Sequence, residues 1–193
     1  YFEGLPVHTL RPLLRHPDLF VQRSATFIAS ELGRQASDLI DDVIPLLSSE
    51  ARWVLSGCMD VLPVHAVGEQ AEKFAHVARM LESVDKVIRI IAMRRVSNVD
   101  VSQLGAAAKF FQRPDHRHGT HERCLVTLSA PGGVTPAAIV AMIHDAYPLV
   151  RRYGAIGASR LIEELPALMM EVAQSEDPDL REFHKSMMEI RGP

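Results

Sequence analysis

The feature of this sequence that most constrains its fold is a repeat with a period of about 33 residues, a length typical of helical repeats. A pair of large apolar residues closes an apolar-periodic segment three times, at Leu13-Leu14, Leu46-Leu47 and Met80-Leu81, and the two spacings agree to within one residue. A period of this length accommodates two helices and the turns that join them. One such helix pair cannot bury its apolar side alone, so the sequence predicts copies that stack on one another.

The second helix of each copy is expected to begin with a buried valine. These valines are Val21, Val54 and Val87, which are separated by one period at both steps. In the first copy the same apolar stripe continues at Ala25, Ile28, Ala29 and Leu32. This spacing is typical of one face of an α-helix. Residues that favour helices dominate the whole chain, and residues 124–128 (CLVTL) are the one stretch with strand character, so the predicted fold class is all-α.

Residues 13–33, with the sequence LLRHPDLFVQRSATFIASELG, resemble a HEAT repeat: a leucine pair, a Pro-Asp turn, a valine that opens the second helix, and a Leu-Gly ending. Residues 43–62 and 74–96 are similar but lack the Pro-Asp turn. The turn itself recurs close to three periods later, at residues 110–115 (FFQRPD), and again at residues 177–180 (DPDL). The QRSATFIASELG pattern is also similar to that of bacterial HEAT-like proteins.

The resemblance implies a right-handed α-solenoid of stacked antiparallel helix pairs whose second helices line a concave face. We expect one domain over residues 1–193, with regular repeats at about 5–111 and divergent repeats at about 112–193. In the divergent part, residues 135–153 and 158–174 are interpreted as longer helices separated by Gly154 and Gly157. The family is a scaffold with many roles, so the resemblance is specific for the fold and says little about function.

The first candidate for a functional surface is the concave face. Phe20 and Trp53 are one period apart, so they occupy equivalent positions on neighbouring second helices, with Lys86 next in the row. The other candidate binding residues of this face are Arg23, Ser56, Met59 and Arg89. Aromatic and arginine side chains are enriched at protein interfaces. The alternative is that Phe20 and Trp53 are buried between stacked repeats, as large aromatic side chains usually are.

A second candidate is a cluster of four possible metal ligands that are close in sequence: His116, His118, His121 and Cys124. Imidazole and thiolate suit zinc, but the spacing matches no familiar zinc motif, and Gly119 and the Pro114-Asp115 turn argue against a regular helix. The alternative is a mobile, solvated loop that interrupts the fourth repeat. We therefore expect neither a metal nor another cofactor.

Composition excludes several classes of protein. With 193 residues, 47% apolar and 23% charged, the chain is neither disordered nor fibrous. The 21 Lys and Arg against 24 Asp and Glu give a net charge of −3, which makes nucleic acid an unlikely partner.

Two cysteines and eight methionines fit a reducing compartment, so we expect a cytoplasmic protein. Charged residues or prolines interrupt every apolar run, so no membrane span is expected. Because the sequence begins at Tyr1 instead of a methionine, the lack of a targeting signal has no weight.

The charges are unevenly distributed along the chain. Residues 61–130 carry ten Lys or Arg and seven acidic residues, whereas residues 1–60 and 131–193 each have a net charge of −3. This basic belt could meet an acidic partner surface or a phosphate. The alternative is an ordinary solvated exterior, because Lys and Arg are usually exposed.

These observations predict a protein that is not an enzyme, since the common nucleophile, phosphate-binding and calcium-binding motifs are missing. The leading hypothesis is a protein-binding scaffold that uses its concave groove, with an immunity or antitoxin role as a narrower form. Two alternatives remain: a DNA-binding enzyme similar to HEAT-like DNA glycosylases, and a module that handles a metal or tetrapyrrole. The sequence does not predict the oligomeric state.

Overall fold

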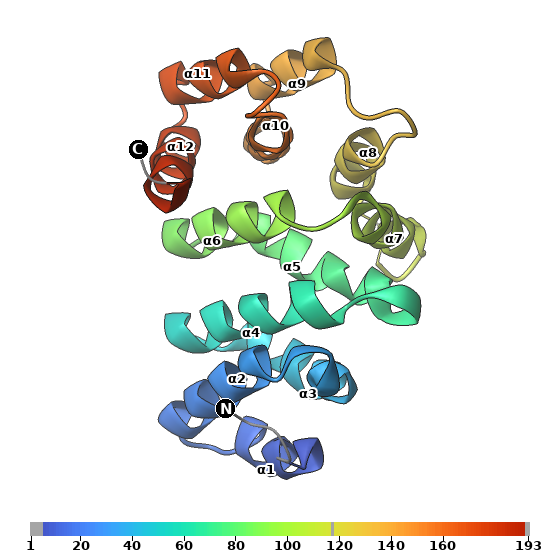
Figure 1. Ribbon diagram of the computed structural model, residues 1–193, viewed down its shortest axis with the longest axis vertical. Helices are drawn as coiled ribbons and strands as arrows, with labels where there is room; N and C mark the ends of the chain where they lie inside the picture. Colours follow the sequence, from blue (N-terminus) through green and yellow to red (C-terminus); the bar gives the residue numbers. More distant parts are fainter. Residues whose placement is uncertain (1–5, 117, 192–193) are drawn as a thin grey trace.

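The computed structural model describes residues 6–116 and 118–191, and every regular element within those ranges is a helix (Figure 1). In the following, η marks a 3-10 helix. The first hairpin consists of η1 (Val7–Leu10), α1 (Arg11–Leu14) and α2 (Leu19–Glu31). The second consists of η2 (Gly33–Leu39), α3 (Ile40–Val43), η3 (Ile44–Ser48) and α4 (Arg52–His65), and the third of η4 (Gly68–Phe74), α5 (Ala75–Arg79), η5 (Met80–Glu82) and α6 (Lys86–Ser97). The later hairpins pair α7 (Val101–Gln112) with α8 (Gly119–Leu128), α9 (Pro136–Ile143) with α10 (Pro148–Arg160), and α11 (Pro166–Gln174) with α12 (Pro178–Arg191). No helix in the described ranges is long and apolar enough to cross a membrane.

The second helices of the first three hairpins form a stack. Helices α2, α4 and α6 lie side by side as successive rungs, and α1, α3 and α5 pack against them (Figure 1). Beyond α6 the direction changes: α10 and α12 both pack on α6, while α7 packs against η4 and α5, and α8 packs against α7 and α10. Figure 1 shows α6 running across the view and α10 nearly end-on, so the C-terminal half is rotated relative to the first three rungs. The chain is an all-α solenoid of stacked helix pairs.

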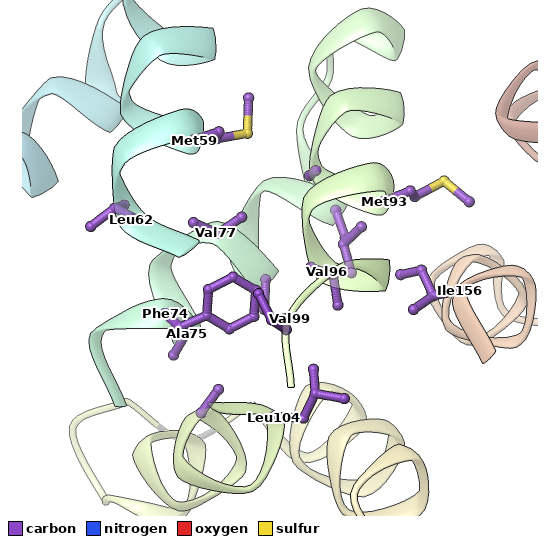
Figure 2. Close-up of a cluster of buried hydrophobic side chains, with 14 of the residues drawn as sticks. Met59, Leu62, Phe74, Ala75, Val77, Met93, Val96, Val99, Leu104 and Ile156 are labelled. Atoms are coloured by element: carbon purple, nitrogen blue, oxygen red, sulfur yellow. The ribbon is translucent and has the colours of Figure 1, made fainter. Parts of the chain in front are cut away.

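One hydrophobic core runs through both halves. Figure 2 shows Phe74 of η4 among buried side chains from α4, α5 and α7, with Val96 of α6 and Ile156 of α10 continuing the cluster toward the C-terminal half. Phe74 and Ile156 are completely buried. The change of direction after α6 therefore does not divide the core, because α10 supplies apolar side chains to the far side of α6.

The turns before α2, α4, α6, α10 and α12 have a recurrent structure. Two residues before the N-cap, a side chain accepts a hydrogen bond from the N-cap amide; this side chain belongs to His16, Ser49, Ser83, Asp145 and Ser175. The backbone carbonyl of the same residue then accepts a hydrogen bond from a side chain six positions later in four of these turns, from Gln22, Arg89, Arg151 and Arg181. Both contacts tie the turn to its helix, which explains why a short polar turn recurs although the helix sequences vary.

These turns correct the expected register of the third rung. The N-caps of α2, α4 and α6 are Asp18, Ala51 and Asp85, so the second step is one residue longer than the first. Val54 is fully buried, but Val87 is 47% exposed, because the residue equivalent to Val54 is Ile88, which is fully buried. The expectation of a buried valine at position 87 is wrong by one residue.

Small residues set the distance between the rungs. Ala25, Cys58 and Ala92 occupy equivalent positions of α2, α4 and α6, counted from the N-cap of each helix, and each side chain is completely buried. Burial raises the pKa of the Cys58 thiol to about 12. Cys58 therefore takes the place of Ala25 in the core of the second rung.

The C-terminal half departs from the expected helix boundaries. Gly154 and Gly157 do not separate helices but lie inside α10, and the breaks fall at residues 144–147 and 161–165. Residues 124–128 belong to α8 and are not a strand. The Pro114-Asp115 turn is present directly after α7, but Asp115 does not cap the next helix, since α8 begins only at Gly119.

By contrast, the last turn matches the first. The Asp177 carboxylate accepts a hydrogen bond from the amide of Asp179 at 2.9 Å, as the Asp18 carboxylate does from the amide of Phe20 at 2.8 Å.

Candidate functional site

Phe20 and Trp53 form an exposed aromatic pair on neighbouring rungs. Both lie at the second position of their helices, α2 and α4, and their rings stack with centroids 5.9 Å apart and planes inclined by 17°. Phe20 is 66% exposed and Trp53 is 44% exposed. The alternative that these rings are buried between repeats is wrong, because both side chains are exposed.

The third member of this row is Val87 and not Lys86. The longer step from α4 to α6 places Val87 at the position equivalent to Trp53, and its side chain is exposed. Lys86 instead forms an exposed ion pair with Glu182 of α12 at 3.5 Å. We call Phe20, Trp53 and Val87 the apolar row.

The other candidate binding residues are divided by the structure. Arg23 is exposed on α2 and lines a hollow of about 430 Å³, whereas Ser56 of α4 is half-buried. Met59 is completely buried, so the expectation that it lies at the surface is wrong. Arg89 has a structural role, since its guanidinium donates to both carboxylate oxygens of Asp179 at 2.7 and 2.9 Å.

One exposed aromatic residue of the same face was not foreseen. Phe27 is 60% exposed and lines the hollow beside Arg23. It lies two helical turns after Phe20, with Arg23 between them, so the three side chains share one face of α2. The helical spacing from Phe20 could have identified Phe27. The repeat gave no signal for it, because the residue one period later, Asp60, is not aromatic.

His121 takes part in a buried hydrogen-bond network. Its ring lies in α8, with no exposed surface, and stacks on Phe111 of α7. Its Nδ1 lies 2.7 Å from the hydroxyl of Tyr153 in α10, and its Nε2 lies 2.9 Å from the carboxylate of Glu82 in η5. Burial lowers the pKa of His121, only partly offset by the hydrogen bond and charge of Glu82, so the neutral ring is favoured. In that form Tyr153 donates to Nδ1 and Nε2–H donates to Glu82.

This network removes His121 from the candidate set of metal ligands, because both of its ring nitrogens are occupied. His116 stacks on Phe110 instead, at a centroid distance of 4.2 Å, and Cys124 is buried. His118 immediately precedes α8 and contacts the rings of Phe111 and His121 edge-on. Within the described ranges no three His, Cys, Asp or Glu side chains come together as metal ligands. The loop alternative is also wrong for residues 119–128, which form α8.

The basic belt is partly neutralised by the acidic flanks. Four of its ten cations pair with acids of residues 1–60 or 131–193: Lys73 with Asp41, Arg95 with Asp60, Arg89 with Asp179, and Lys86 with Glu182. The stacking of rungs brings these segments together. The uneven charge of the sequence is thus in part an internal pairing between neighbouring hairpins.

Comparisons with known proteins give no family. No protein-family model matches the sequence, and no curated protein matches it. Among solved structures, the chain is similar to an archaeal HEAT-like repeats protein from Thermococcus onnurineus NA1, at 16% identity and a TM-score of 0.48, covering 95% of this chain and 86% of that one. An engineered protein is matched at 14% identity and a TM-score of 0.47, covering 95% of both chains. A designed armadillo repeat protein is matched at 13% identity and a TM-score of 0.42, covering 96% of this chain and all of that one. The fold is assigned from the helix packing described above.

Proposed function

We propose that this solenoid is a non-catalytic scaffold that binds another protein through the apolar row. The observation that supports the proposal is the stacked Phe20–Trp53 pair, which keeps two large aromatic rings in water. Burying such rings removes a large apolar area from water at a low entropic cost, and this is why aromatic residues dominate the binding energy of many interfaces. Val87 extends the row to a third rung.

A protein partner fits this surface better than a nucleic acid does. The row is apolar, the net charge is −3, and four cations of the basic belt are already paired with acids of the chain. Attraction of a phosphate backbone requires several unpaired cations along one groove. We propose a cytoplasmic protein of bacterial type, and the narrower hypothesis of an immunity or antitoxin role predicts a tight one-to-one complex with a toxin domain.

The test uses Trp53, the single tryptophan of the chain, as a spectroscopic probe. A protein partner isolated from the source organism should form a stoichiometric complex and change the fluorescence of Trp53. Phe20→Ala should weaken this complex at least about tenfold, a loss of at least about 1.4 kcal/mol, because removal of a hot-spot side chain typically costs about 2 kcal/mol or more. It leaves the probe in place.

Tyr147→Ala is the matched control. Tyr147 is also an exposed aromatic residue, 70% exposed, but it precedes α10 in the C-terminal half. This substitution should leave the affinity unchanged. Equal affinities for the wild type and Phe20→Ala, or a loss with Tyr147→Ala alone, would show that the partner uses another surface.

A further inference from the structure

A cleft lies between the second and third hairpins, and none of its lining residues belongs to the apolar row. Its volume is about 800 Å³, which is in the range of small-molecule sites. One side is formed by residues 44–55, around η3 and the start of α4, and the other by residues 76–85 of α5, η5 and the turn to α6. His118, from the connection before α8, closes the lining. The cleft thus combines side chains from both halves of the solenoid.

Glu82 lines this cleft, and a hydrogen bond from a buried histidine orients its carboxylate. Its Oε2 accepts a hydrogen bond from Nε2 of the buried His121, whose Nδ1 is in turn bonded to the completely buried Tyr153. About half of the Glu82 side chain is exposed, so the carboxylate is both held and accessible. A hydrogen-bonded chain of this kind fixes a surface carboxylate that would otherwise sample many rotamers.

Arg79 supplies the opposite charge in the same cleft. Its guanidinium is exposed, and across residues 6–116 and 118–191 it has neither a hydrogen bond nor an ion pair. The other arginine of the cleft, Arg52, is by contrast paired with Asp85. His76 and His118 line the cleft as hydrogen-bonding groups beside Arg79. Arg79 and Glu82 line the same cleft, and the described residues form no ion pair between them.

The remaining lining of the cleft is apolar. It includes Ile44, Pro45, Leu47, Leu55 and Met80. A ligand that satisfies the whole cleft therefore carries a negative group, a positive group and an apolar body. A simple anion is disfavoured, because Glu50 adds a further carboxylate to the lining.

We propose that this cleft binds a small zwitterion, an amino acid or short peptide with an apolar side chain, with Arg79 on its carboxylate and Glu82 on its ammonium group. The guanidinium can take a carboxylate through two parallel hydrogen bonds. Glu82 accepts from the ammonium group through the oxygen that His121 leaves free, and the apolar side chain lies over Leu47 and Leu55. His121 is a positioning residue in this arrangement. The site is independent of the protein-binding proposal, since it shares no residue with the apolar row.

The test is a titration of the isotope-labelled protein followed by NMR. Leucine, phenylalanine and alanyl-phenylalanine are the probes, and at least one should give saturable shifts confined to the cleft residues. Derivatives of the binding probe that lack one charge, N-acetylated or C-amidated, should each bind at least about tenfold more weakly, as expected for losing one charge-assisted hydrogen-bonded pair.

Two variants assign the charges to residues. In Arg79→Gln the amidated derivative should bind as well as the unmodified probe, because the carboxylate has lost its partner. In Glu82→Gln the same should hold for the acetylated derivative, while the amide oxygen still accepts from His121 and preserves the fold. Thermal unfolding of each variant checks that it remains folded.

Arg23→Gln is the matched control. Arg23 is likewise an exposed arginine without an ion pair in the described residues, but it lies on α2 and does not line the cleft. This substitution should leave the affinities for the three probes and their blocked derivatives unchanged. The proposal is overturned if none of the three probes binds saturably, if the blocked derivatives bind as well as the zwitterion to the wild type, or if Arg23→Gln has the effect expected of Arg79→Gln.

Discussion

At the scale of single residues, buried histidines make the fold sensitive to acid. His65, at the end of α4, is almost completely buried, and neither ring nitrogen has a hydrogen-bond partner among the described residues. Burial lowers the pKa of His65, and the nearby backbone of Ala29 offsets only part of this effect. The pKa values of His76 and His121 are lowered by burial as well. The native state therefore resists protonation at all three rings.

We predict that the free energy of unfolding falls as the pH drops below about 6.5, the pKa of a histidine in an unfolded chain. Below that pH the histidines of the unfolded chain bind protons, whereas the buried rings of the native state stay neutral, so the free energy of unfolding decreases as the pH falls. His65→Leu should raise stability by about 1–3 kcal/mol, because two unsatisfied polar atoms are removed, and should reduce the slope with pH. Urea unfolding between about pH 5.5 and 7.5 measures both. His8→Leu, at an exposed site, is the control and should leave the slope unchanged.

Glycine has two different roles within the helices. At Gly154 of α10 an added Cβ would lie 2.6 Å from the backbone nitrogen of Ile143 and 2.8 Å from the carbonyl carbon of Met142. This glycine permits α9 and α10 to pack closely. At Gly105 of α7 the nearest atoms, from the side chain of Ser129, would lie at 3.7 and 3.8 Å, which is ordinary contact.

Substitution by alanine should therefore have opposite effects at these two positions. Gly154→Ala should destabilise the protein by about 1–3 kcal/mol, because the backbones of α9 and α10 must move apart. Gly105→Ala should stabilise it by up to about 1 kcal/mol through helix propensity. Chemical denaturation of both variants gives the two values, and destabilisation of similar size at both sites would disprove the close approach at Gly154.

At the scale of helices, α6 is the joint between the two halves, and three arginines fasten it. Arg89 of α6 pairs with Asp179 of α12, and Arg152 of α10 reaches both the carboxylate of Asp179 and the carbonyl of Leu81. Arg160, near the end of α10, donates to the carbonyls of Ser97 and Val99 at the end of α6. These contacts hold α10 and α12 against a helix whose direction they cross.

Removal of the Asp179 charge tests this joint. Burial raises the pKa of Asp179, but the hydrogen bond from Arg89 and the charges of Arg152 and Arg89 outweigh it, and the net pKa is lowered. Asp179→Asn should cost about 3 kcal/mol of stability, because two largely buried arginines lose their counter-charge. Glu182→Gln, on the same helix, is the control: its pair with Lys86 is exposed on both sides and should contribute less than about 1 kcal/mol. Equal losses in thermal or urea unfolding would show that Asp179 does not fasten the joint.

At the scale of the whole molecule, the sequence predicted what repeats and missed what joins distant segments. The period of the sequence identified the rungs and the row of Phe20 and Trp53, because stacked hairpins translate equal spacing into neighbouring positions. A single extra residue in the third hairpin was enough to exchange Val87 with Ile88. The partners of His121 could not be foreseen, since Glu82 and Tyr153 are distant from it in the sequence and belong to no shared motif.

The environment of Trp53 is the most direct test of the central claim, that the stacked rungs expose the apolar row to a partner. As the single tryptophan, it gives an unambiguous signal in the isolated protein. We predict a red-shifted emission that acrylamide quenches readily in the native state, with quenching that increases further in Phe20→Ala because the stacked ring no longer covers one face of the indole. A blue-shifted emission that becomes accessible to acrylamide only on unfolding would contradict the exposed row and, with it, the proposed binding surface.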